Sequence, residues 1–329
     1  MTASDPAATT LDRLVGPTRL VLGTMTFGDT ADVAAAARML DTALDAGVTS
    51  IDTANAYAGG TTEEILRDLL RERRERIVLA TKAGMPHPDI GEHSPLSAAG
   101  LRAAVEGSLR RLGTERVDLL YLHKPDRAAP IGETVETLGE LLREGRIGAW
   151  GISNYAAWQV AELNHAAAVA GVPGPAVGQQ LYNLLSRRIE EEYVEFARTA
   201  GLPTIVYNPL GGGLLTGKYS FDEPAQGGRF DTSRVAAMYT DRYWNRALFD
   251  AVERLSAIAG DAGIGLVELS LRWLCGRPGS DALLLGGSRV EQLQANIDAV
   301  ARGPLPDDVV AACDEVGDAL RGPMPAYNR

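Results

Sequence analysis

Ile77-Val78-Leu79-Ala80-Thr81-Lys82 is a short apolar run that ends at a lysine. Two similar runs flank it in the chain: Ser50-Ile51-Asp52 ends at an aspartate, and Val117-Asp118-Leu119-Leu120-Tyr121-Leu122-His123 ends at a histidine. An apolar run followed by a helical pattern is typical of a buried parallel strand and its crossover helix. When such strands close into a barrel, their carboxyl ends meet at one mouth. We therefore expect Asp52, Lys82 and His123 to face a common pocket.

The alternation of strand and helix continues along the chain. Further strands are expected at 19–22, 147–152, 176–180, 204–207 and 282–285, each followed by a helical pattern. Eight such units predict an α/β protein of the (β/α)8 TIM barrel class. Two additions are expected: a long loop after the seventh strand, at 208–245, and an extra C-terminal helix near 307–320 followed by a tail. Capping boxes are expected at 61–64 and 288–291.

Length and composition set the limits of the prediction. The chain has 329 residues, more than the roughly 250 of a typical barrel, but no linker interrupts the alternation. We expect a single domain over 1–329, with residues 1–15 flexible. The net charge of −11 disfavours nucleic acid as a partner, because phosphate binding needs a basic surface. Cys275 and Cys313 lack the spacing of metal ligands, so no metal site is expected.

The sequence also bears on location. No stretch approaches the roughly 20 apolar residues of a membrane span. The polar start lacks the apolar core of a signal peptide, and we expect a cytoplasmic protein that does not bind membranes.

Lysine is rare in this chain. Only three of its 32 basic residues are lysines, namely Lys82, Lys124 and Lys218. A lysine at the end of a buried strand suggests a task that arginine cannot perform, because an ammonium can change its pKa and a guanidinium cannot. For Lys124, a solvated loop position is the simpler interpretation.

Glycine-rich turns follow the last two predicted strands. Gly211-Gly212-Gly213 precedes Lys218, and Gly286-Gly287-Ser288 precedes Arg289. Barrels often bind phosphate with the loops after strands seven and eight and a helix N-terminus. A guanidinium at that position is suited to a phosphomonoester. A Rossmann site is not expected, because no GxGxxG follows the first strand.

These motifs together resemble a known family. The run Asp52-Thr53-Ala54-Asn55-Ala56-Tyr57, followed by Lys82 and His123, resembles the Asp, Tyr, Lys and His tetrad of the aldo-keto reductases. The segments 151–155, 180–183, 208–218 and 286–296 resemble the cofactor-binding segments of that family. Within the family, the runs 121–126, 153–158, 228–230 and 238–244 are most similar to the aflatoxin-aldehyde and succinic-semialdehyde reductase subgroup.

The resemblance implies an NADPH-dependent reduction of aldehydes or ketones to alcohols. A carbonyl that accepts hydride needs a proton donor and polar groups near its oxygen. Tyr57 would be the donor, with its pKa lowered by Lys82. Asp52 would pair with Lys82, and His123 would orient the substrate carbonyl.

The resemblance also implies which residues bind the ligands. NADPH would contact Gly23, Thr24, Met25, Asp52, Ser153, Asn154, Gln180, Tyr207, Asn208, Pro209, Leu210, Gly212, Leu214, Gly217, Lys218, Arg229, Gly286, Ser288, Arg289, Gln292 and Asn296. Among these, Ser153, Asn154 and Gln180 would bind the carboxamide, Tyr207 would stack on the ring, and Arg289 would hold the 2′-phosphate. The substrate would contact Met25, Tyr57, His123, Arg242, Tyr327 and Arg329.

Two other functions remain open. In a Schiff-base aldolase, Lys82 would attack a carbonyl, although Tyr57 would then have no task. In a regulatory module, the chain would bind NADPH as a sensor with weak turnover. The sequence leaves open the physiological carbonyl compound, and a homodimer is possible.

Overall fold

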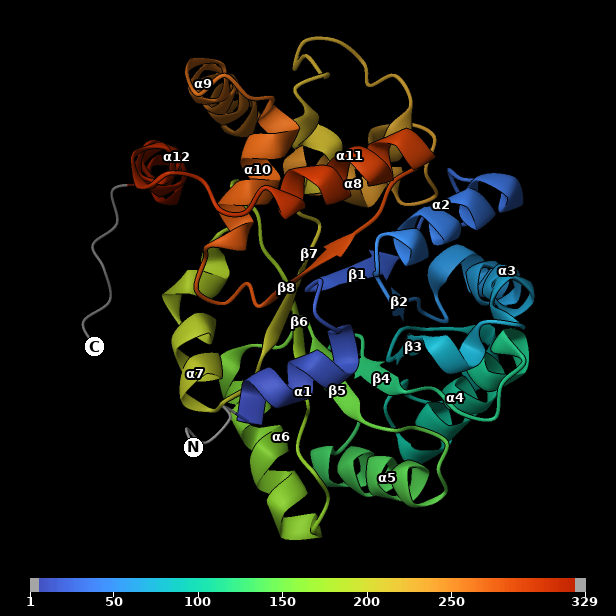
Figure 1. The fold of residues 1–329 in the computed structure, drawn as a ribbon. Coiled ribbons are helices and arrows are strands. Elements are labelled where there is room, and N and C mark those ends of the chain that lie inside the picture. Colours follow the sequence, from blue (N-terminus) through green and yellow to red (C-terminus); the bar gives the residue numbers. More distant parts are fainter. Residues whose placement is uncertain (1–5, 323–329) are drawn as a thin grey trace.

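A closed parallel barrel forms the centre of the computed structural model, which describes residues 6–322 (Figure 1). Each strand pairs with its neighbours in chain order, and the eighth pairs with the first. The strands are β1 (Leu20–Gly23), β2 (Ser50–Asp52), β3 (Val78–Ala83), β4 (Leu119–Leu122), β5 (Trp150–Ser153), β6 (Gly178–Leu181), β7 (Thr204–Tyr207) and β8 (Ala282–Leu285). The prediction of a (β/α)8 TIM barrel is confirmed.

Helices surround the barrel as the crossovers between consecutive strands (Figure 1). They are α2 (Val33–Asp45), α3 (Thr61–Leu70), α4 (Ala98–Leu112), α5 (Ile131–Arg143), α6 (Ala157–Ala170), α7 (Tyr193–Thr199), α9 (Arg246–Asp261), α10 (Leu266–Cys275) and α11 (Val290–Ala301). Short 3-10 turns supplement them: η1 (Tyr57–Gly60), η2 (Arg74–Arg76), η3 (Pro88–Ile90) and η4 (Arg188–Glu191). The helix expected over 189–200 is interrupted at Glu192, whose backbone is not helical. The separate helix α10 was not predicted.

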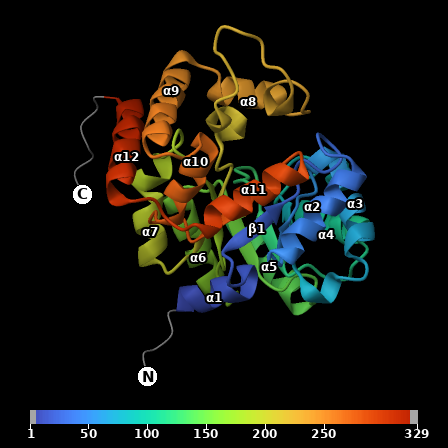
Figure 2. The same cartoon turned by 45° about the horizontal axis from the view of Figure 1, so that its top comes forward.

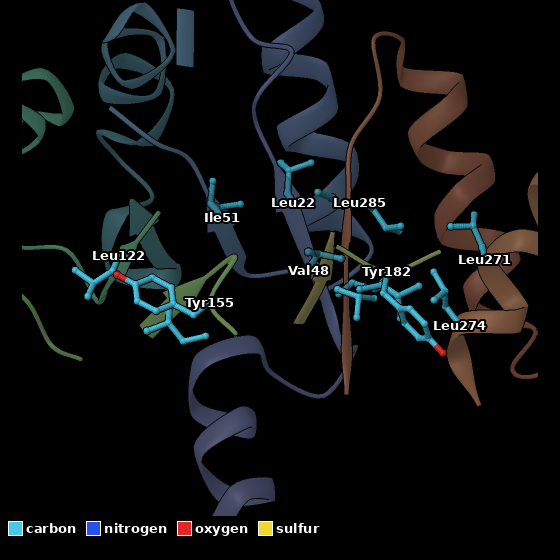
Figure 3. Close-up of a cluster of buried hydrophobic side chains, with 14 of the residues drawn as sticks. Leu22, Val48, Ile51, Leu122, Tyr155, Tyr182, Leu271, Leu274 and Leu285 are labelled. Carbon is cyan, nitrogen blue, oxygen red and sulfur yellow. The ribbon is translucent and has the colours of Figure 1, made fainter. Parts of the chain in front are cut away.

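Side chains alternate along each strand between the barrel interior and the helix layer. On the outside, Leu22, Ile51, Leu122 and Leu285 belong to the large core cluster that also includes Leu274 of α10 (Figure 3). This alternation decides the orientation of the strand-end residues. Residues two positions apart on a strand share a face, so the neighbours of the outward-facing leucines point into the barrel.

The interior of the barrel is closed at one end by an N-terminal helix, α1 (Pro6–Val15). Leu11, Leu14 and Val15 are buried in a second cluster, together with strand residues such as Tyr121 and Ile205. In Figure 2, α1 lies at the opposite end of the molecule from α8 (Ala236–Tyr243). The expectation that residues 1–15 are flexible is therefore wrong for residues 6–15, because apolar burial holds this helix against the barrel.

The long loop after β7 contains the short helices η5 (Gly211–Thr216), η6 (Gly228–Phe230) and α8. Its middle is fixed to the loop after β1, because Ser233 donates a hydrogen bond from its hydroxyl to Asp29 Oδ2 at 2.6 Å. An aromatic cluster that includes Phe230, Tyr239 and Trp244 supports it from within. The predicted excursion is thus an ordered structure.

The predicted C-terminal helix is α12 (Asp307–Arg321). Asp314 fixes it to the barrel through ion pairs with Arg187 at 3.1 Å and with Arg277 at 2.7 Å. Tyr327 and Arg329, the tail residues proposed to contact substrate, lie outside the described residues. No helix within 6–322 is long and apolar enough to cross a membrane.

Candidate functional site

Lys82 lies at the centre of a buried polar cluster inside the barrel mouth. Its side chain is 1 % exposed, and its ammonium donates to Asp52 Oδ1, to the carbonyl of Thr53 at 3.0 Å and to the hydroxyl of Tyr57 at 3.1 Å. The residues come from three places: β2 ends at Asp52, β3 carries Lys82, and η1 begins at Tyr57. The predicted convergence of these three side chains is present in the structure.

Burial and pairing set the charge of Lys82. Burial alone lowers its pKa, but the charge of Asp52, the phenol of Tyr57 and the hydrogen bonds to both outweigh burial, so the pKa is raised. Lys82 is therefore an ammonium at neutral pH, and its three hydrogens are all engaged.

The pKa of Tyr57 departs from the expectation. We expected Lys82 to make this phenol more acidic overall, but its pKa is raised, because burial outweighs the opposing effect of Lys82. The charge of Asp52 adds to the rise. Tyr57 is therefore fully protonated at neutral pH, and Lys82 only limits the effect of burial.

His123 follows β4 and completes the cluster. Its ring meets the ring of Tyr57 edge to face, with 6.0 Å between the centroids and 84° between the planes. Burial, then the charges of Lys82 and Lys124, lower its pKa to about 3, so the imidazole is neutral at physiological pH. Its Nδ1 atom is buried and has no hydrogen-bond partner within residues 6–322. This imidazole can thus donate a hydrogen bond without carrying charge.

A glutamine that the sequence reasoning missed holds the other oxygen of Asp52. Gln179 donates from Nε2 to Asp52 Oδ2 at 2.8 Å and is 2 % exposed. The predicted neighbour, Gln180, faces the opposite side of β6, where it donates to the backbone carbonyl of Tyr155 at 2.9 Å and bonds to the hydroxyl of Tyr193. The assignment of Gln180 to the mouth is therefore wrong, because adjacent strand residues point to opposite faces.

The residues after β5 are tied to the rest of the mouth. Asn154 has a left-handed backbone with φ 63°, donates from Nδ2 to the carbonyl of His123 at 2.9 Å, and accepts from the Tyr207 hydroxyl at 2.6 Å. Ser153 is buried beside it and accepts from the same amide at 3.0 Å. Ser153, Asn154 and Tyr207 therefore gather in one place, as predicted.

Asn208 shapes the glycine turn after β7. It is buried, has φ 58°, and accepts the backbone N–H of Gly212 on its Oδ1 at 2.7 Å. Its amide donates to the hydroxyl of Tyr243 at 2.8 Å, and Asn183 donates to the carbonyl of Asn208 at 2.9 Å. Tyr243 was not predicted as part of the site, because its link to Asn208 spans 35 residues.

Three predicted cofactor cations surround the other side of the mouth. Arg229 donates to the Tyr239 hydroxyl at 2.9 Å, and Lys218 lies over the ring of Tyr219 with 4.6 Å between Nζ and the centroid. Arg289 is exposed, and its side chain forms no ion pair or hydrogen bond in the described part of the chain. None of the three cations has a carboxylate partner there, so each is available to an anion.

The capping box expected over 288–291 is absent. Arg289 occupies the N-cap of α11 without a side-chain hydrogen bond. Ser288 instead donates from its hydroxyl to Gln292 Oε1 at 3.2 Å.

The remaining predicted residues divide by exposure. Gly23, Thr24, Pro209, Gly212, Leu214 and Asn296 are buried, Met25, Leu210, Gly286 and Gln292 are half-buried, and Gly217 and Arg242 are exposed. Thr24 uses its hydroxyl to donate to the carbonyl of Asp52 at 2.9 Å. At Gly212, with φ 72°, a Cβ would approach Tyr239 within 2.5 Å, so this turn needs glycine. In residues 6–322, no group of three or more His, Cys, Asp or Glu side chains could hold a metal ion.

Comparisons with known proteins agree with this arrangement. The sequence profile of the Aldo/keto reductase family matches residues 19–318. The chain is 36% identical over 325 residues to aflatoxin B1 aldehyde reductase member 2 of Rattus norvegicus, covering 94% of this chain and 87% of that protein. It is 37% identical over 325 residues to aldo-keto reductase family 7 member A3 of Homo sapiens, covering 94% and 96%.

A third relative has a different description. The probable voltage-gated potassium channel subunit beta of Arabidopsis thaliana is 34% identical over 296 residues, covering 87% of this chain and 88% of that protein. All of these matches include the strands that carry the buried cluster, and they extend far beyond it. The chain belongs to the aldo-keto reductase family.

Proposed function

We propose that this protein reduces aldehydes or ketones to alcohols with NADPH, and that Tyr57 donates the proton. The observation that supports this proposal most directly is the contact of 3.1 Å between the Tyr57 hydroxyl and the Lys82 ammonium. A protonated phenol beside a fixed cation can give its proton to a developing alkoxide, and the cation then stabilises the phenolate that remains.

The other two members of the cluster have separate tasks. Asp52, bonded to both Lys82 and Gln179, keeps the ammonium charged and in place. His123 is neutral, so it can hydrogen-bond the carbonyl oxygen without competing with Tyr57 as an acid. Together these groups orient the carbonyl and direct the proton to its oxygen.

The mouth fits a nicotinamide dinucleotide phosphate. Reduced nicotinamide supplies the hydride when bound. The exposed cations Lys218 and Arg289 suit its phosphates, and the glycine turns at 211–213 and 286–287 leave backbone accessible to them. Asn154 and Ser153 present amide and hydroxyl groups that suit the carboxamide. Gln179, which faces the same interior as Asp52, replaces Gln180 as the glutamine of this set.

A Schiff-base aldolase is a poorer account of the site. Such an enzyme needs a neutral lysine amine with a free lone pair. The Lys82 pKa is raised, and its three hydrogen bonds occupy the ammonium. The geometry therefore favours a structural cation over a nucleophile.

A sensor that binds NADPH and turns over slowly is the second candidate. The similarity to the Arabidopsis thaliana protein described as a channel subunit favours it. Rapid mixing with NADPH and an aldehyde distinguishes the two functions. Continued turnover supports the reductase, whereas a single slow turnover with retained cofactor supports the sensor.

Tyr57→Phe tests the proposed role directly. We expect turnover to fall by about 10²- to 10⁴-fold, as is typical for loss of a positioned acid. NADPH affinity, measured by fluorescence titration, should stay close to that of the unmodified protein. Succinic semialdehyde, a dicarbonyl and an aryl aldehyde should be assayed by NADPH absorbance. A loss of cofactor binding instead of turnover would show that the role is misassigned.

Two further points remain proposals. The partner is a small carbonyl compound, which Met25 and Arg242 could contact at the mouth. A homodimer is testable by sedimentation, and a monomer at all concentrations would exclude it.

A further inference from the structure

Glu63 is a completely buried carboxylate in the first turn of α3. The sequence suggested a capping box over 61–64, but Gly60 occupies the N-cap position and no side chain caps the helix. Glu63 instead accepts the Thr81 hydroxyl on Oε1 at 2.6 Å and Arg111 Nε on Oε2 at 2.8 Å. A buried carboxylate is costly unless it is paired, so this position requires an explanation.

Arg111 also touches the turn that carries Tyr57. At Gly60, with φ 99°, a Cβ would lie 2.8 Å from Arg111 Cδ and 2.9 Å from its Nε. The arginine side chain therefore lies directly against the backbone of η1. Its guanidinium is fixed further by Asp89, at 2.7 Å from NH1.

The η1 turn has little support of its own. Ala58, Gly59 and Gly60 all have left-handed backbones, with φ 46°, 65° and 99°. A non-glycine residue such as Ala58 rarely adopts this conformation without outside support. The groups that hold the turn from behind therefore determine where Tyr57 lies.

The two ends of this contact chain flank the reacting groups. Thr81 directly precedes Lys82 on β3, and Glu63 follows Tyr57 by one turn and the start of α3. Because neighbouring strand residues face opposite sides, Thr81 points to the helix layer while Lys82 points into the barrel. The contact chain thus joins the support of the ammonium to the support of the phenol, outside the barrel.

We propose that Thr81, Glu63 and Arg111 form a clamp of positioning residues that sets the separation between the Tyr57 hydroxyl and Lys82. The clamp touches neither substrate nor cofactor and acts only through the η1 turn and β3. This inference rests on the proposed function and deepens it, since it assigns a source for the 3.1 Å contact. Errors of about 1 Å in such geometry can cost roughly 10²-fold in rate.

Thr81→Val is the primary test, because it keeps the shape of the side chain and removes the hydroxyl. We expect kcat to fall about tenfold, while the KM for the carbonyl and the affinity for NADPH stay within about twofold. Thr81→Ser restores the hydroxyl and should return kcat to within about twofold of the unmodified protein. Glu63→Gln should lower kcat in the same selective way.

Thr137→Val is the matched control. Thr137 is also buried, but its hydroxyl donates at 2.8 Å to the carbonyl of Glu133 within α5. The same atoms are removed there without touching η1 or β3, so kcat should not change. If Thr137→Val lowers kcat as much as Thr81→Val does, the effect is general destabilisation and the clamp is refuted.

A second measurement does not depend on reductase activity. In protein labelled with [13Cζ]tyrosine, the Tyr57 resonance can be assigned from its absence in Tyr57→Phe. We expect Thr81→Val to shift this resonance and Thr137→Val to leave it unchanged. If the unmodified protein reduces no carbonyl compound, the proposed function fails while the resonance still tests the clamp. An unshifted resonance in Thr81→Val would overturn the clamp whatever the activity.

Discussion

The catalytic cluster and the cofactor side of the mouth use charge in opposite ways. Lys82 and Asp52 are each 1 % exposed and are paired with each other. Lys218 and Arg289 are exposed and have no carboxylate partner in residues 6–322. A buried charge must be satisfied inside the protein, whereas an exposed one can stay in water until an anion binds. The first region is therefore complete in the folded chain, and the second is built to be completed by a ligand.

The largest contrast should come from Lys82→Met. Turnover should fall by at least about 10³-fold, since both the cation and the fixed geometry are lost. The change also leaves Asp52 as an unpaired buried charge, so the free energy of unfolding should drop by about 3–5 kcal/mol in urea titrations.

A double variant separates the two effects of Lys82→Met. Adding Asp52→Asn removes the unpaired charge and should recover much of the stability but none of the turnover. Recovery of turnover in the double variant would contradict the proposed role of the ammonium.

Arg289→Ala tests the opposite region. Because Arg289 is exposed and unpaired, its removal should change the free energy of unfolding by less than about 0.5 kcal/mol. The affinity for NADPH should fall about tenfold, as expected for the loss of charge-assisted hydrogen bonds, while the affinity for NADH stays constant. Equal effects on the two cofactors, measured by fluorescence titration, would show that Arg289 does not bind the 2′-phosphate.

His123 predicts a pH dependence of stability. Its pKa is lowered to about 3 in the folded protein, compared with about 6.5 when unfolded. The unfolded chain therefore binds the additional proton between these values, so the contribution of His123 is complete above about pH 6.5 and is lost as the pH falls towards 3.

We expect unfolding curves of His123→Gln to be less sensitive to acid than those of the unmodified protein. The difference should approach 1.4 kcal/mol per pH unit, the limit for one proton. His165→Gln is the control, because His165 is exposed on α6. Parallel curves for the unmodified protein and His123→Gln would contradict the buried neutral imidazole.

The smallest effect concerns the tail. Deleting residues 327–329 removes Tyr327 and Arg329, which the sequence places near an acidic substrate. The KM for succinic semialdehyde should rise about two- to fivefold relative to a neutral aldehyde, the range expected for one exposed ion pair. An unchanged ratio of the two KM values would remove Arg329 from the substrate site.

The success of the sequence prediction depended on how strongly the backbone fixes each residue. Asp52, Lys82 and His123 end buried strands, so the barrel itself brings them together. Gln179 and Gln180 are adjacent, and only the inward or outward parity of β6 separates them. The inward-facing Val177, two residues before Gln179, is the signal that was available.

Other errors arose from contacts distant in sequence. The helical spacing of Leu11, Leu14 and Val15 indicates an apolar face on α1, but its partners belong to strands far along the chain. Glu63 fits a capping pattern, yet its true partner Arg111 lies 48 residues away. The raised pKa of Tyr57 depends on burial, which no local pattern records.

The N-terminal helix has a consequence for the order of assembly. The surface on which Leu11, Leu14 and Val15 rest is made by residues such as Val21, Tyr121 and Ala282, which come from β1, β4 and β8. That surface exists only once the last strand has joined the first. Although it is synthesised before the strands, α1 can reach its final place only after the ring has closed, so a probe on this helix would report the completion of folding.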